Sequence, residues 1–350
     1  MIDQEIKMTA LKKDDLAPFV LKDVSGLEQG EERGSGAYGF VRTVTVRGAK
    51  CIAKRMHDIL HDKEVPPLQQ QFIRKKFRDE CKMLSELRHP NIVVFVGVHY
   101  GKSKDDISLI MEALHTDLNN FIKKAATPIP LSLKLSILFD VTYGLLYLHT
   151  YTPSPIIHRD LNVNNILLTE DLRAKIADLG VSKFLDMTKR KSQTIAPGAW
   201  DYMPPEAMVD DPTYNTSLDI FSFGHVMLCV GNQDIPALTL KGGSGKSLHG
   251  NVEIKRRKKY LDALGEKHCL YPLVIQSLQD SANKRPTTRE LCDRLQKLCV
   301  AYPRCVADVL KVVGMGKGEI VSVEGWKGSS CSMPCFLCVG GSGVVAQMLH

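Results

Sequence analysis

Three polar residues in the middle of the chain have the types needed to handle a proton and a cation. The segment HRDLNVNN contains Asp160 and Asn165, and the nearby segment IADLG contains Asp178. A carboxylate such as Asp160 can accept a proton from a hydroxyl group. Asn165 and Asp178 offer oxygen ligands of the kind that Mg²⁺ binds. These segments therefore predict a proton acceptor beside a magnesium site.

A glycine-rich segment, GSGAYGFV, predicts a loop that binds phosphate groups. Gly34, Gly36 and Gly39 let the backbone N–H groups approach phosphates without a clash from Cβ atoms. The spacing alone also occurs in dinucleotide-binding folds, in which a helix follows the glycines. Here the strand-like FVRTVTV follows. A turn between two strands is therefore favoured over a dinucleotide site.

A lysine and a glutamate nearer the N-terminus form a plausible pair. Lys54 ends the apolar strand-like segment CIAK, and Glu80 lies in FRDECKML. Each alone is typical of a surface charge. Together they suit phosphate binding, because a lysine on a flexible stem needs a carboxylate to hold it in place.

The elements around these residues divide the chain into two parts. Residues 24–54 alternate like strands with a turn at Arg47-Gly48, and residues 68–88 have the apolar spacing of an amphipathic helix. Short strands are expected in 91–100 and 107–113. Beyond residue 115 the pattern is helical, with long apolar helices expected over 131–149 and 219–230. A small β-rich part followed by a larger helical part predicts an α+β, two-lobed fold.

In this order the motifs resemble those of a eukaryotic protein kinase domain. The matching segments are GSGAYGFV, CIAK with Glu80, HRDLNVNN, DLG, MPPE, DIFSFG and NKRP. The resemblance covers about residues 22–300 and implies a bilobal fold. It divides the chain into an N-terminal extension 1–21, an N-lobe of about 22–111, a hinge of about 112–116, a C-lobe of about 117–300 and a tail 301–350. The tail is rich in Gly, Ser and Cys, and its composition predicts poor order.

The resemblance implies ATP and Mg²⁺ as cofactors and protein substrates as partners. Asp160, Lys54 and Asn165 take the catalytic positions, and Asn165 and Asp178 those that hold Mg²⁺. The implied ATP-binding residues are Gly34, Ser35, Gly36, Ala37, Gly39, Val41, Ala53, Lys54, Glu80, Met111, Glu112, Leu114, Leu167 and Asp178. Among these, Ala53 and Val41 would lie above the adenine and Leu167 below it, with backbone hydrogen bonds from Glu112 and Leu114.

The same resemblance implies structural roles. Glu206 and Arg285 match a buried ion pair of the family, and Asp219 matches the residue that braces the catalytic loop. The positions of an apolar spine that joins the lobes are Leu84, Phe95, His158 and Leu179.

Two departures bear on activity and specificity. Asn162 and Ala199 stand where serine/threonine kinases usually have lysine and threonine, and loss of a cation should weaken stabilisation of the transferring phosphoryl group. The loop most resembles those of the tyrosine-kinase-like group. We expect serine/threonine phosphorylation, with a pseudokinase scaffold and a tyrosine or dual-specificity kinase as alternatives. If Asn162 is only a weaker electrostatic partner, Asn162→Lys should preserve or raise activity.

Arg159 directly precedes Asp160, as in kinases that are switched by phosphorylation. Candidate acceptors in the following segment are Thr188, Ser192 and Thr194. A phosphate on one of them could pair with Arg159 and order the segment. For any single one of these residues, simple exposure to solvent is the alternative interpretation.

Composition sets the remaining expectations. The net charge of +7 suits nucleotides and is too dispersed for a nucleic-acid binder, so no nucleic-acid partner is expected. No leader, transmembrane run or disulfide framework is apparent, which favours a cytoplasmic location, with the nucleus as the alternative. The segment KGGSGKS at 241–247 lacks the first glycine of a P-loop and is interpreted as a flexible loop. The oligomeric state is not specified by the sequence.

Overall fold

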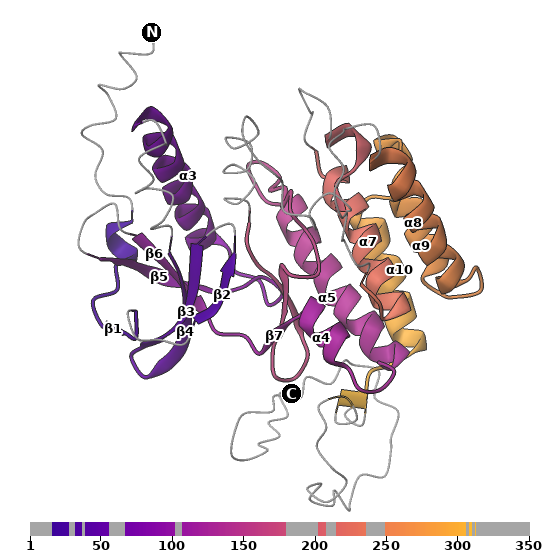
Figure 1. The fold of residues 1–350 in the computed structure, drawn as a ribbon, viewed down its shortest axis with the longest axis horizontal. Coiled ribbons are helices and arrows are strands. Elements are labelled where there is room, and N and C mark those ends of the chain that lie inside the picture. The colour runs from indigo at the N-terminus through magenta and orange to yellow at the C-terminus, as the bar shows by residue number, and fades with distance from the viewer. Residues whose placement is uncertain are drawn as a thin grey trace, which may run out of the picture.

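The computed structural model describes two lobes joined by a short connection (Figure 1). The described residues are 16–27, 32–36, 39–55, 67–101, 107–179, 202–207, 215–235, 249–305, 308–309 and 312. Strands and one long helix form the N-lobe, and helices dominate the C-lobe. The bilobal α+β fold expected from the sequence is therefore confirmed.

The N-lobe is built on an antiparallel sheet in the order β1-β3-β4-β6-β5, with β2 paired to β3. Arg47 and Gly48, at the turn between β3 and β4, both have positive φ, of 50° and 82°. Positive φ at two central residues is the geometry of a tight hairpin turn, which confirms the turn predicted there. The strands are β1 (Val24–Ser25), β2 (Glu32–Gly36), β3 (Gly39–Val46), β4 (Ala49–Arg55), β5 (Phe95–Tyr100) and β6 (Ile107–Glu112).

Residues 16–21, expected to lie in an extension before the kinase-like region, form part of the N-lobe. Leu16 is 1% exposed and belongs to the same buried cluster as Phe77 and Cys81 of helix α3 (Pro67–Glu86). The Leu21 amide donates to the Val98 carbonyl of β5 at 2.8 Å. The folded N-lobe thus begins several residues before the predicted boundary.

This segment lies so close to β5 that it requires a glycine there. A Cβ atom on Gly97 would come within 2.6 Å of the Phe19 carbonyl oxygen and 2.7 Å of the Leu21 side chain. Phe19 also packs edge-on against Phe95, with ring centroids 5.6 Å apart. The close approach explains why the apolar strand contains a glycine.

The C-lobe is a group of helices beside a small antiparallel sheet, β7-β8-β9. The strands are β7 (Thr116–Asp117), β8 (Ile166–Leu168) and β9 (Ala174–Ile176). The helices are α4 (Leu118–Lys124), α5 (Leu131–His149), α7 (Ser217–Asn232), α8 (His249–Leu264), α9 (Tyr271–Ser277) and α10 (Thr288–Ala301). Helices α5 and α7 have the bounds expected from their apolar runs, to within two residues.

Helix α5 lies in the core of this lobe. By length and composition it could cross a membrane, but 56% of its most apolar stretch is buried inside the protein. Its Leu135, Leu138 and Leu145 are fully buried. Packing in the core accounts for its apolar character.

Residues 91–93, expected to start a strand of the N-lobe, instead pair with the C-lobe. The Val93 amide donates to the Ile176 carbonyl, and the Ile176 amide donates to the Asn91 carbonyl, both at 2.9 Å. The Asn91 side chain adds a hydrogen bond to the Ala174 carbonyl at 2.9 Å. The segment before β5 therefore connects the two lobes through β9, which its apolar sequence did not indicate.

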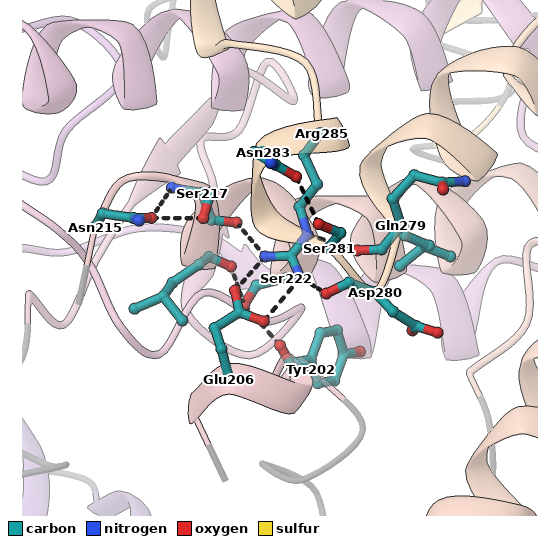
Figure 2. A network of polar contacts seen from close by, with 12 residues as sticks. Tyr202, Glu206, Asn215, Ser217, Ser222, Gln279, Asp280, Ser281, Asn283 and Arg285 are labelled. Carbon is teal, nitrogen blue, oxygen red and sulfur yellow. Dashed lines mark hydrogen bonds and ion pairs between the residues drawn. The ribbon is translucent and has the colours of Figure 1, made fainter. Parts of the chain in front are cut away.

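An ion pair between Glu206 and Arg285 fastens segments of the C-lobe together (Figure 2). The two terminal guanidinium nitrogens of Arg285 donate to the Glu206 carboxylate, and Nε donates to the Gln279 carbonyl at 2.8 Å. The Arg285 guanidinium also lies over the Phe221 ring, 4.9 Å from its centroid. Because a bidentate pair fixes both position and orientation, it joins the segment that contains Glu206 to α7 and α10. The ion pair expected from the sequence is confirmed.

Packing continues beyond residue 300, the predicted end of the kinase-like region. Arg304 donates to the carbonyls of Asp171 and Leu172, between β8 and β9. The Ser132 hydroxyl of α5 donates to Asp308 at 2.5 Å. These contacts place the described residues of the expected tail against the C-lobe.

Several residues singled out in the sequence lie outside the described residues. They are Ala37, the segment 241–247, Ala199 and the candidate phosphorylation sites Thr188, Ser192 and Thr194. Their predicted roles remain predictions.

Truncation of Leu16 tests whether residues 16–21 belong to the folded unit. Leu16→Ala should lower the free energy of unfolding of the full chain by about 3 kcal/mol, because it leaves a cavity in a packed cluster. Denaturant unfolding followed by circular dichroism measures this change. The control is Val300→Ala, at a residue that is 77% exposed, for which a change below about 0.5 kcal/mol is expected. Equal stabilities for both variants would contradict the prediction.

Candidate active site

One buried carboxylate anchors the loop that follows α5. Asp219 of α7 is fully buried and accepts hydrogen bonds from the backbone amides of His158 at 2.8 Å and Arg159 at 2.9 Å. Its Oδ2 atom also contacts Nε2 of His149, at the end of α5, at 2.8 Å. Burial alone would raise the pKa of Asp219, but the hydrogen bonds and the histidines outweigh it and lower the pKa. The bracing role expected for Asp219 is confirmed.

The same loop is joined to the segment that carries Asp178. His158 Nε2 lies 2.8 Å from the Ala177 carbonyl, and the Asp160 amide donates to His158 Nδ1 at 3.2 Å. This arrangement requires the His158 proton on Nε2. The Ala177 amide donates to the Asn165 carbonyl at 2.9 Å. Asp160, Asn165 and Asp178 are thus brought together by backbone hydrogen bonds.

Two residues of the site have an unusual backbone conformation. Arg159 and Asp178 have φ values of 67° and 63°. Non-glycine residues rarely adopt this left-handed region, and they keep it only where the surrounding contacts enforce it. Here the hydrogen bonds to Asp219 and to residues 158 and 165 provide such contacts.

Lys54 of β4 reaches across from the N-lobe to Asp178. Its Nζ atom lies 2.5 Å from Asp178 Oδ1, and only 11% of its side chain is exposed. Burial would raise the pKa of Asp178, but Lys54 outweighs burial and lowers it, so the carboxylate is ionised at neutral pH. The predicted lysine and the predicted metal-binding carboxylate therefore form a direct ion pair between the lobes.

The oxygen atoms that remain suit a magnesium ion. Asn165 uses its Nδ2 atom to donate to the Asp160 carbonyl at 2.7 Å and to Asp160 Oδ2 at 3.0 Å. Its Oδ1 atom accepts no hydrogen bond from the described residues. Mg²⁺ is commonly held by one or two protein oxygens together with phosphates and water.

The residues expected to surround a nucleotide come from the N-lobe sheet that contains Lys54 and from β8 of the C-lobe sheet. Gly34 pairs with Val41 and Gly36 with Gly39, so these glycines lie at the end of the β2–β3 hairpin, with Ser35 between them. In β4, Ala53 is buried and pairs with Ile110 of β6. The adjacent residue, Ile52, pairs with Met111. Leu167 of β8 pairs with Asp117 beyond the hinge, three residues after Leu114.

Glu112, at the hinge, makes contacts that the sequence did not predict. Its Oε1 atom accepts from the Val94 amide and from Nζ of Lys175 in β9, both at 2.7 Å. Its own amide donates to the Val94 carbonyl at 3.1 Å. The hinge is therefore tied to the strand that leads to Asp178. A single lysine between two apolar residues was the available signal, although it does not reveal the partner.

His149 was also missed by the sequence analysis. It is buried at the end of α5, where Nδ1 lies 2.6 Å from the Thr288 hydroxyl of α10 and Nε2 contacts Asp219. A histidine that closes an otherwise apolar helix was the available signal, although it does not reveal the partner.

The chain matches the family model described as protein tyrosine and serine/threonine kinase over residues 27–295. This match covers most of the chain and includes every described residue of the candidate site. The chain belongs to the protein kinase family.

Serine/threonine-protein kinases are among the curated proteins that resemble this kinase domain. A probable serine/threonine-protein kinase of Dictyostelium discoideum is 34% identical over 59% of this chain and 32% of its own length. Serine/threonine-protein kinase 12 of Arabidopsis thaliana is 29% identical over 72% of this chain and 52% of its length. The Arabidopsis serine/threonine-protein kinase VIK is 28% identical over 77% of this chain and 59% of its own length. The chain spans less than two thirds of each of these relatives.

In this kinase domain, all four residues expected to form the apolar spine are buried. They are Leu84, Phe95, His158 and Leu179. Glu80 lies in α3, as expected, and its side chain is outside the described part of the structure. The predicted pairing of Glu80 with Lys54 thus stays a prediction.

Replacement of Asp219 tests how much its hydrogen bonds to the catalytic loop contribute to stability. Asp219→Asn turns an N–H group toward donors and should lower the free energy of unfolding at pH 7 by about 3–5 kcal/mol. Because the pKa of Asp219 is lower in the folded state, its stabilisation is present above the unfolded value, near pH 4, and is lost as pH falls further. The difference between wild type and variant should therefore shrink below about pH 4.

Denaturant unfolding between pH 3 and pH 8 measures this difference. Asp293→Asn, at an exposed position of α10, is the matched control and should change stability little. A wild-type advantage that grows as pH falls would refute this account.

Proposed function

We propose that this chain transfers the γ-phosphate of ATP to serine or threonine hydroxyls of protein substrates. The observation that carries the proposal is the convergence of Lys54, Asp160, Asn165 and Asp178. Each has the residue type that phosphoryl transfer needs. The resemblance to proteins named serine/threonine kinases supports the choice of acceptor.

In the proposed mechanism, Asp160 accepts the proton of the attacking hydroxyl. The Asn165 amide, 3.0 Å from Asp160 Oδ2, orients this carboxylate. Lys54 would contact the nucleotide phosphates, and its ion pair with Asp178 supports this role. Asn165 and Asp178 would hold Mg²⁺, which when bound neutralises charge on the transferring phosphoryl group.

The remaining nucleotide contacts follow from the sheet and the hinge. We propose that Gly34, Ser35, Gly36 and Gly39 cover the phosphates and that Val41, Ala53 and Leu167 enclose the adenine. Met111, Glu112 and Leu114 would line its edge. The positions in β2, β3, β4 and β6 belong to the same sheet as Lys54, which supports this proposal, whereas Leu167 belongs to β8 of the C-lobe sheet. Asn162 and the order of motifs support membership of the tyrosine-kinase-like group.

Replacement of the proposed base tests the activity. Purified full chain with Mg-ATP should phosphorylate a peptide library that contains serine, threonine and tyrosine, and Asp160→Asn should reduce the rate at least about 100-fold. Asp262→Asn, at an exposed position of α8, is the control and should retain the wild-type rate.

Phosphoamino-acid analysis of the products then tests the acceptor. Phosphoserine and phosphothreonine are expected. Phosphotyrosine alone would overturn the assigned specificity. Failure of the wild type to transfer phosphate, while it still binds nucleotide, would favour the pseudokinase alternative.

A further inference from the structure

Asn162 is buried inside the catalytic loop, and both the nitrogen and the oxygen of its side-chain amide are hydrogen-bonded. Only 8% of the residue is exposed. Its Nδ2 atom donates to the Asp160 carbonyl at 3.0 Å, and its Oδ1 atom accepts from the Asn164 amide at 2.9 Å. The side chain thus links the backbone two residues before it to the backbone two residues after it. A lysine has no acceptor and could make only one of these two bonds.

The carbonyl that Asn162 contacts belongs to the proposed base. The same oxygen also accepts from Asn165 Nδ2 at 2.7 Å. Two side-chain amides therefore fix the peptide unit that follows Asp160. The preceding residue, Arg159, has a strained φ of 67°, and such a conformation persists only where neighbouring contacts determine it.

The hydrogen bonds continue from Asn162 to the first turn of α4. The Asn164 Oδ1 atom accepts from Asn119 Nδ2 at 2.8 Å, and the Asn119 amide donates to the Val163 carbonyl at 3.1 Å. Asn162, Asn164, Asn165 and Asn119 together form a neutral amide network between α4 and Asp160. A network of this kind restricts motion of the loop without adding charge to it.

We propose that Asn162 is a positioning residue, which acts on phosphoryl transfer by holding Asp160 in place through this amide network. The inference rests on the proposed function as a protein kinase. It replaces the expectation that Asn162 is a weaker electrostatic partner of the phosphoryl group. Lysine at this position should accordingly disturb the loop and should not improve transfer.

The test compares Asn162→Ala, Asn162→Ser and Asn162→Lys in the full chain. We expect Asn162→Ala and Asn162→Lys to lower kcat about 10- to 100-fold, because small displacements of a catalytic group cost that much. The KM for ATP should change less than about twofold, since the hydrogen bonds described for the Asn162 side chain go to Asp160 and Asn164. Serine keeps a donor and an acceptor, so Asn162→Ser should recover part of the lost kcat.

Hydrogen exchange at the Asn164 amide gives a readout that does not require activity. This amide donates to Asn162 Oδ1, so its exchange should accelerate in Asn162→Ala and Asn162→Lys and less in Asn162→Ser. Asn283→Ala, at an exposed residue far along the chain, is the matched control and should leave both kcat and this exchange unchanged. Thermal unfolding identifies any variant that does not fold, in which case the two remaining variants carry the comparison.

The outcomes separate the inference from the proposed function. A wild-type kcat retained or exceeded by Asn162→Lys would overturn the positioning role and restore an electrostatic one. An unchanged kcat in Asn162→Ala would also overturn it. A wild type that transfers no phosphate would overturn the proposed function, whereas unchanged exchange at Asn164 in Asn162→Ala would overturn the hydrogen-bonded position of Asn162 itself.

Discussion

The buried carboxylate of Asp219 is the interaction on which the arrangement of the site depends. It receives two backbone amides of the catalytic loop and one histidine of α5, so three elements meet at one side chain. A buried charge is tolerated only when hydrogen bonds replace its lost hydration. The hydrogen bonds that Asp219 requires therefore fix His158 and Arg159 at the start of the loop, and Asp160 is the next residue. Helix α7, as part of the C-lobe core, gives the carboxylate a rigid support.

Three of the contacts between the lobes lead to Asp178 or to the strand before it. Lys54 binds Asp178 itself, while Glu112 of the hinge binds Lys175 in β9. Residues 91–93 add backbone hydrogen bonds to the same strand. A movement of the N-lobe must therefore act on β9 and on the Asp178 carboxylate together. This coupling is built from hydrogen bonds and charges rather than from the apolar core alone.

The sequence singled out residues that the structure brings together. Lys54, Asp160, Asn165 and Asp178 were chosen for the chemistry of their side chains, and their catalytic and metal-binding roles stay predictions. Asp219 and the pair of Glu206 and Arg285 were also foreseen. What could not be foreseen were partners chosen by tertiary packing, such as Lys175 for Glu112 and Thr288 for His149. Nothing in a linear pattern specifies which distant residue a buried polar group will meet.

Asn162 is a second case in which the sequence did not reveal the role of a residue. Its difference from lysine was visible, but its burial and its two hydrogen bonds were not, so the sequence alone indicated a missing charge. The first boundary was misplaced for a related reason. Residues 16–21 have no clear period, and their place is set by β5 and α3 instead of by local propensity.

The position of residues 16–21 has a consequence for how the domain can be isolated. Strand β5 lies at the end of the N-lobe sheet, and its outer side is paired only by this segment among the described residues. A polypeptide trimmed to the region shared with its relatives, 27–295, would lose that cover. An uncovered strand edge invites pairing with another chain and aggregation. Self-association of such a fragment would then reflect the cut, and would say nothing about how the intact protein assembles.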